Sequence, residues 1–256
     1  MRRLILLVIL GAFFAGVVFA QSNKPWSEWS KEEVGRMLNA SPWGQTQVDT
    51  DTTEMFYSPT KAGTSSVGSS LSKATIGKVS DQQTVNNNRA DRGATNTAVS
   101  VNYHVRFLSA KPVREAISRM IMLSPHQPVE DFAGLMQPFV DRDFGEYIVL
   151  SVTLDSSDGR FSAPALQTFA SATAATLRNT TYLERKDGKR LYLMEYRPPQ
   201  DDGLGAKFVF PRIVEGKAFL TSHDGSVRFY SEAGNNIKLN VKYKLADMIY
   251  DGKLEY

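Results

Sequence analysis

The sequence predicts an α+β fold with a mainly antiparallel β-sheet, two to four helices and an antiparallel meander of strands at the C-terminal end. Three observations support this prediction. Residues 99–108 alternate strictly between apolar and polar side chains, which is typical of a half-buried strand. Two stretches with apolar residues at helical spacing follow, at 110–123 and 164–177. The last third returns to alternating runs separated by Asp-Gly pairs, which favour the tight turns of hairpins.

The first 20 residues have the pattern of a secretory signal peptide. Arg2 and Arg3 precede an uncharged apolar stretch at 4–19, and small residues stand at 18 and 20. We therefore expect cleavage after Ala20 and a mature protein that is periplasmic or secreted. An uncleaved membrane anchor is the alternative, because the apolar stretch approaches the roughly 17–25 residues that span a bilayer.

Composition limits the chemistry that remains. The chain of 256 residues has no cysteine, which excludes disulfides, a thiol nucleophile and cysteine metal sites. Of its 30 basic and 27 acidic residues, two basic ones lie in the leader, so the rest carries a net charge of about +1. This charge gives no reason to expect a nucleic-acid partner. No membrane contact is expected beyond the signal segment.

We expect four regions along the chain. They are a signal peptide at 1–20, an amphipathic helix and first strand at 21–57, a flexible low-complexity insertion at 58–98 and an α+β body at 99–256. The insertion is rich in Ser, Thr, Asn, Gly and Lys and has no aromatic residue, so it buries too little apolar surface to offset the entropy of ordering it. A strand at about 45–57 is expected to pair across it with the strand at 99–108, because closure entropy grows slowly with loop length.

Three local signals predict a helix at the start of the mature chain. Ser30 is placed to cap its first turn, and Glu33 completes a capping box with it. Trp29 and Val34 occupy the two positions of a hydrophobic staple. The helix is expected to end at the Ser-Pro pair at 41–42.

The remaining elements have weaker signals. We expect Ser109 to cap the helix at 110–123, a second helix at 129–141 and a central strand at 147–154. Residues 218–230 resemble one strand pair of a β-propeller blade, but no second copy occurs, so a simple hairpin is expected there. Turns are expected at the Asp-Gly pairs 187–188, 202–203, 224–225 and 251–252. The pattern leaves open whether the body forms one sheet or two domains.

The motifs that suggest catalysis lack the context that catalysis needs. Residues 49–53 match the Asp-x-Asp-x-Thr pattern of aspartate-nucleophile phosphatases, which use one Asp as nucleophile and a Mg²⁺ ion. Such a motif follows a buried apolar strand, whereas residues 44–48 supply one apolar side chain. The three histidines have no zinc-site spacing. We therefore expect no catalytic residue, no metal site and no cofactor, with a metal-dependent hydrolase using Asp49 and Asp51 as an alternative.

Three tryptophans, Trp26, Trp29 and Trp43, are the most unusual feature of the mature N-terminal region. Aromatic side chains of this kind anchor ligands and partner proteins, so the three residues are a candidate contact surface. The competing interpretation is that they dock the first helix onto the sheet, which also explains the staple position of Trp29.

The segments Trp26 to Ser30, Ser41 to Trp43 and Lys244 to Glu255 resemble a group of uncharacterised exported bacterial proteins that share a Trp-x-x-Trp and Ser-Pro-Trp N-terminal region. The resemblance covers both ends of the mature chain, and the insertion is the part that it covers least. It implies export and a shared domain, and it transfers no catalytic residue.

These observations predict a non-catalytic binding or interaction protein of the bacterial envelope. Its partner is unknown, with an envelope protein or a glycan as candidates. The periplasmic metal-dependent hydrolase is one alternative. The other is a structural or assembly protein that uses exposed sheet edges for strand pairing.

Overall fold

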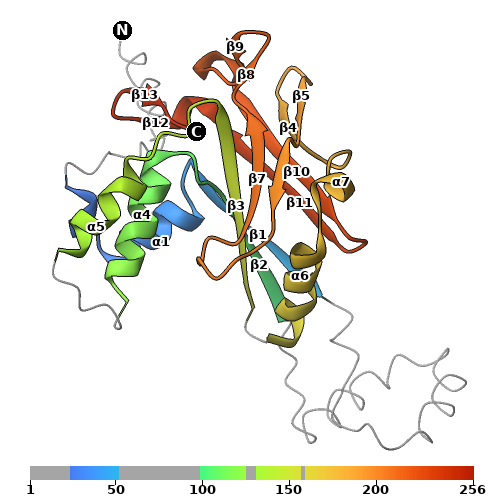
Figure 1. Ribbon diagram of the computed structural model, residues 1–256, viewed down its shortest axis with the longest axis horizontal. Helices are drawn as coiled ribbons and strands as arrows, with labels where there is room; N and C mark the ends of the chain where they lie inside the picture. The colour runs from blue at the N-terminus through green and yellow to red at the C-terminus, as the bar shows by residue number, and fades with distance from the viewer. Residues whose placement is uncertain (1–23, 52–98, 125–130, 157–158) are drawn as a thin grey trace, which may run out of the picture.

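Two antiparallel sheets packed face to face form the centre of the molecule (Figure 1). The computed structural model describes residues 24–51, 99–124, 131–156 and 159–256. The predicted signal peptide and the predicted insertion lie outside these ranges. Within the described ranges, no helix is long and apolar enough to cross a membrane.

Sheet A has five strands. Their order is β1 (Gly44–Asp51), β2 (Val99–Phe107), β3 (Tyr147–Ser156), β7 (Ala206–Pro211) and β6 (Glu195–Arg197). Sheet B has four strands, in the order β11 (Ile237–Lys244), β10 (Ser226–Ala233), β4 (Thr181–Arg185) and β5 (Arg190–Tyr192). Two short hairpins complete the strands of the described ranges. They are β8 (Ile213–Val214) with β9 (Lys217–Ala218) and β12 (Ile249–Tyr250) with β13 (Lys253–Leu254).

The helices cover sheet A unevenly. They are α1 (Lys31–Asn39), α4 (Lys111–Met122), α5 (Phe132–Val140), α6 (Gly159–Ser171) and α7 (Ala174–Leu177). Short 3₁₀ helices are η1 (Trp26–Glu28), η4 (Ser222–Asp224) and η5 (Leu245–Asp247). Helices α1, α4 and α5 pack together on the outer side of sheet A, whereas sheet B lies on its inner side (Figure 1). Among the residues that the structure describes, they cover one end of the outer face and leave the other end uncovered.

Aromatic rings from the two inner faces meet in the core. The rings of Phe107 and Tyr243 lie edge to face at 4.8 Å between centroids, and those of Phe208 and Phe229 at 5.3 Å. All four side chains are buried. Along β11 the side chains alternate between buried and exposed, as a sheet with one solvated face requires.

Both seams between the sheets are bridged. At one seam the chain bends from β5 into β6. Of the two residues between these strands, Leu193 donates a backbone hydrogen bond to β4 and Met194 donates one to β7. At the other seam the side-chain amide of Gln47 donates to the carbonyl of Lys238 (2.7 Å) and accepts from the backbone N–H of Asn240 (2.8 Å). The two sheets therefore form a nearly closed sandwich around one core.

The predicted α+β fold class is confirmed, and the local signals near the N-terminus are accurate. Ser30 Oγ accepts from the Glu33 N–H at 3.2 Å, and Glu33 Oε2 accepts from the Ser30 N–H at 2.6 Å, which is a complete capping box. Strands β1 and β2 pair antiparallel along their described length. Strand β3 is central in sheet A, and α5 lies within the range predicted for a second helix.

Three predicted details are wrong. Ala110, not Ser109, is the N-cap of α4, because the Ser109 hydroxyl instead accepts from the Val149 N–H at 3.0 Å and ties the loop to β3. The helix predicted from residue 164 starts at Gly159 and is split in two, because Thr173 caps the separate helix α7. Residues 218–230 do not form a hairpin, since η4 precedes β10 and β10 pairs with β4 and β11.

Candidate functional site

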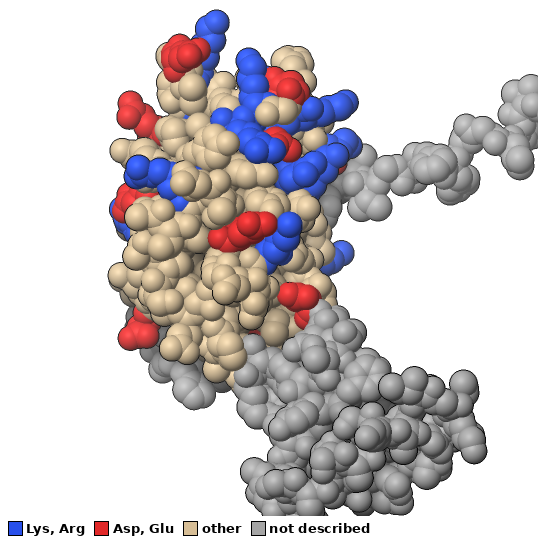
Figure 2. Space-filling view, turned by 90° about the vertical axis from the view of Figure 1, so that its right-hand side faces the viewer, with Lys and Arg blue, Asp and Glu red and all other residues tan. Residues whose placement is uncertain are grey.

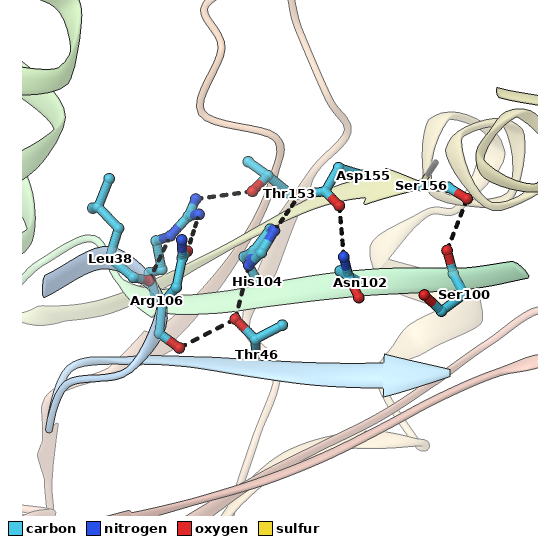
Figure 3. Close-up of polar contacts among 10 residues, drawn as sticks. Leu38, Thr46, Ser100, Asn102, His104, Arg106, Thr153, Asp155 and Ser156 are labelled. Carbon is cyan, nitrogen blue, oxygen red and sulfur yellow. Dashed lines mark hydrogen bonds and ion pairs between the residues drawn. The ribbon is translucent and has the colours of Figure 1, made fainter. Parts of the chain in front are cut away.

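The uncovered end of the outer face of sheet A carries a group of polar side chains from three strands (Figure 3). The strand register places Thr46 opposite His104, His104 opposite Thr153, and Asn102 opposite Asp155. Opposed residues in a sheet project to the same face, so all five side chains meet there. We call Thr46, Asn102, His104, Arg106, Thr153 and Asp155 the polar network.

His104 is the centre of the polar network. Its Nδ1 lies 2.9 Å from Thr46 Oγ1, and its Nε2 lies 2.7 Å from Asp155 Oδ2. The second carboxylate oxygen of Asp155 accepts from Asn102 Nδ2 at 2.8 Å. The hydrogen bond from His104 is the main reason that the pKa of Asp155 is lowered, with partial burial acting in the opposite direction. Asp155 therefore stays ionised and holds both neighbours in fixed positions.

Arg106 forms the covered border of the polar network. It donates to the Leu38 carbonyl (2.9 Å), to Asn39 Oδ1 (2.8 Å) and to Thr153 Oγ1 (2.8 Å). Leu38 and Asn39 are the last residues of α1, whose terminal carbonyls need partners and favour a positive charge. Burial lowers the pKa of Arg106 to about 10, which still leaves it charged at neutral pH.

The polar network contains a hydroxyl, an imidazole and a carboxylate in contact, but its exposure is the reverse of a hydrolytic triad. In such triads the carboxylate is buried behind the imidazole and the hydroxyl faces the substrate. Here the Asp155 side chain is 61% exposed and that of His104 is 11% exposed. The Thr46 hydroxyl also lies 3.1 Å from the Asn39 carbonyl, which is a second acceptor for its only proton. The exposure of the three groups therefore differs from that of a hydrolytic triad.

A groove lined by other residues lies on the same face of sheet A. Its volume is about 540 Å³, and its floor includes Leu108, Val149 and Val209. Two ion pairs also line it, Lys207 with Asp202 (2.6 Å) and Arg197 with Glu195 (2.7 Å). The strand register links the two features, because Arg106, Ser151, Lys207 and Arg197 follow one another in a single row across four strands.

The tryptophans that the sequence offered as a contact surface lie elsewhere. Trp29 is 5% exposed and Trp43 is 3% exposed, and both belong to the hydrophobic core. Trp26 is partly buried against the same core. The indole N–H of Trp43 donates to the Glu255 carbonyl at 2.8 Å. The rings of Trp29 and Trp43 are thus inaccessible in this fold. For these two residues, this favours the interpretation that they dock the first helix onto the sheet.

The residues of the hydrolase alternative do not gather around a metal site. Asp49 is exposed on β1, and the side chain of Asp51 lies outside the described part of the structure. The described ranges contain no group of three or more His, Asp or Glu side chains that could hold a metal ion. His104 belongs to the polar network and His223 to η4, whereas His126 lies outside the described ranges.

One signal for the polar network is visible in the sequence. The strict alternation along residues 99–108 places Asn102, His104 and Arg106 on the polar side of a strand. Their partners from β1 and β3 are separated from them by about 50 residues or more, so only the strand register brings them together.

A comparison with known protein families, with curated proteins and with solved structures finds no match. The resemblance to exported bacterial proteins therefore stays a prediction. Function is inferred here from the outer face of sheet A and the chemistry of its side chains.

Proposed function

We propose that this protein is a non-catalytic binding protein of the bacterial cell envelope, and that it contacts its ligand or partner through the polar network and the groove on the same face. The observation that carries the proposal is that the exposed carboxylate of Asp155 is held in place by hydrogen bonds with the half-buried Asn102 and His104. A surface that is already ordered loses little conformational entropy on binding. Asp155, whose side chain is 61% exposed, presents a charged acceptor on this surface.

The groove supports the same proposal. Its volume of about 540 Å³ lies within the range of ligand sites, which runs from roughly 300 to 1,000 Å³. It combines an apolar floor with paired charges in its lining, which suits a ligand or peptide that has both apolar and polar groups. The charged lining of the groove is mixed, with three basic and four acidic residues, so it does not favour a strongly ionic ligand of either sign.

The alternatives gain less support. Asp49 belongs to no group of potential metal ligands in the described chain. Assembly through sheet edges requires free backbone groups, whereas the Gln47 amide already occupies part of the β11 edge.

Export is tested by the mass of the protein recovered from cells that express the complete chain. We expect a product that begins at Gln21, found in the periplasmic fraction or the medium. A membrane-bound product that retains residues 1–20 indicates the uncleaved anchor. A soluble cytosolic product of full length contradicts export.

Binding through the outer face of sheet A is tested by photo-crosslinking in intact cells. Val48 lies on β1, opposite Asn102 of β2, and is 58% exposed. A crosslinking amino acid at this position should yield a discrete adduct. The matched control is the same substitution at Leu166, which is 47% exposed on α6. Equal yields at both positions, or an adduct at Leu166 alone, would refute the proposed surface.

The role of Asp155 is tested in the same cells. Asp155→Asn keeps the shape of the side chain and removes its charge, so the Val48 adduct should decrease about ten-fold, as expected for the loss of one hydrogen bond to a charged group. A Val48 adduct of unchanged yield in D155N would show that the polar network does not contribute to binding. Melting curves of D155N and wild type show whether the variant is folded.

A further inference from the structure

The outer face of sheet B is positively charged at one end. Lys and Arg side chains gather over the upper half of this face in Figure 2. Arg228, Lys242 and Lys244 are exposed on β10 and β11, and Lys186 is exposed in the turn after β4. The Lys186 side chain extends past Gly225, next to Ser226, which is opposite Lys244. We call Lys186, Arg228, Lys242 and Lys244 the basic end of sheet B.

Like charges face each other directly in this region. Arg228 is opposite Lys242 in the register of β10 and β11, and such a pair of cations destabilises a sheet. Glu184 binds Arg190 at 2.6 Å and lies 3.8 Å from Arg228, and Asp247 binds Lys244 at 2.9 Å, so acidic side chains compensate part of the charge. Lys242 makes no ion pair within the described ranges. A bound anion would relieve the repulsion that the fold leaves in place.

The neighbouring aromatic row limits what this face can bind. The rings of Tyr182 and Tyr230 are stacked at 5.0 Å with an angle of 20°. Arg190 lies over Tyr182 at 4.3 Å, and Lys238 lies over Tyr230 at 5.3 Å. These two tyrosines therefore stack within the sheet, and their ring faces are not free to stack on nucleic-acid bases or sugars. Recognition here depends on charge and on the polar edges of the rings.

The shape of the face also matters. The groove on sheet A and a second, smaller cavity beside it are both lined by residues from other parts of the molecule. The basic end is instead part of the outer surface of a four-stranded sheet. A broad positive face with tyrosines beside it suits a broad anionic surface.

We propose that the outer face of sheet B rests on an anionic membrane surface, where its basic end binds lipid phosphate groups. This goes beyond the proposed function, because it concerns the side of the molecule opposite α1, α4 and α5 (Figure 1). The polar network and the groove would then face away from the membrane and stay accessible to a partner. The near-zero net charge of the mature chain does not reveal this surface, because a net charge does not show where the charged residues lie.

Vesicle binding of the protein recovered from the envelope tests this proposal. The vesicles contain either phosphatidylcholine alone or equal parts of phosphatidylcholine and phosphatidylglycerol. We expect binding only to the second kind, and a loss of that binding at high salt. Each basic side chain near an anionic leaflet strengthens binding roughly five-fold, so Lys242→Glu, which changes the charge by two, should weaken it about 25-fold.

The K242E variant separates binding from stability. Its carboxylate lies opposite Arg228, so the melting temperature should stay the same or rise while vesicle binding falls. Lys31→Glu on α1 makes the same change of charge at an exposed site outside sheet B and should bind vesicles as the wild type does.

Three results would overturn the proposal. One is K242E binding like the wild type. Another is wild-type binding that does not depend on phosphatidylglycerol or salt, which would indicate insertion of an apolar segment. The third is binding to polyphosphate or a single-stranded oligonucleotide without binding to vesicles, which would indicate a soluble polyanion.

Discussion

Replacing Trp43 with alanine is expected to lower the free energy of unfolding by about 3–5 kcal/mol, the usual loss for a buried tryptophan. The Trp43 ring is 3% exposed and lies edge to face with Tyr250, with centroids 5.9 Å apart. Its indole N–H donates to the Glu255 carbonyl. Trp43 thus joins the start of β1 to the C-terminal hairpin of β12 and β13. The variant loses the ring contact, the hydrogen bond and the packing between the two ends of the chain.

Urea and thermal denaturation measure this loss. For a protein of this size, it corresponds to a decrease in melting temperature of roughly 6–20 °C. Trp26→Ala is the matched control, because Trp26 is only partly buried and should cost about 1 kcal/mol. If W43A were as stable as the wild type but lost partner binding, Trp43 would be a contact residue, as the sequence allowed.

The sequence predicts well those features that neighbouring residues determine. The capping box of Ser30 and Glu33 needs only residues within one helical turn, and it forms as expected. The alternation along β2 arises because one face of the strand is solvated. It correctly assigns Tyr103 and Val105 to the buried face and His104 to the polar face. The pairing of β1 with β2 also follows, because each strand lies at one end of the same insertion.

The features that the sequence misses depend on distant partners. The carbonyl that accepts from Trp43 is 212 residues away, so the sequence offers burial of this ring as one of two interpretations but does not identify the partner that holds it. Residues 218–230 look like a hairpin because one apolar run follows another, yet β10 finds its partners in β4 and β11. The Thr221 and Asp224 side chains meanwhile form a capping box that turns the intervening residues into η4.

The two proposed surfaces show the same distinction. Residues from β1 and β3 complete the polar network around His104, and the strand register alone decides which they are. The basic end of sheet B also depends on register, because Arg228 and Lys242 lie on the two strands of one hairpin and are opposite each other only in the register that it adopts. Composition reports total charge, whereas binding depends on where the charges lie.

Replacing Arg106 with alanine is expected to lower the free energy of unfolding by about 2–4 kcal/mol. Three acceptors lose their donor, namely the Leu38 carbonyl, Asn39 Oδ1 and Thr153 Oγ1. Each loss of a hydrogen bond to a charged group costs roughly 1.5–3 kcal/mol, but the variant also avoids burying a cation. That burial is substantial, since it lowers the pKa of Arg106 to about 10. The net effect is therefore smaller than the sum of the three bonds.

Lysine is not an adequate substitute at this position. Arg106→Lys keeps the charge but replaces a planar fork of donors with one ammonium group, so it should recover only part of the lost stability. Hydrogen exchange at the end of α1 should speed up in both variants, because Leu38 and Asn39 end that helix. Arg36→Ala, at an exposed position of the same helix, is the control and should change stability by no more than about 0.5 kcal/mol. R106A with the stability and exchange rates of R36A would show that Arg106 does not hold α1 to sheet A.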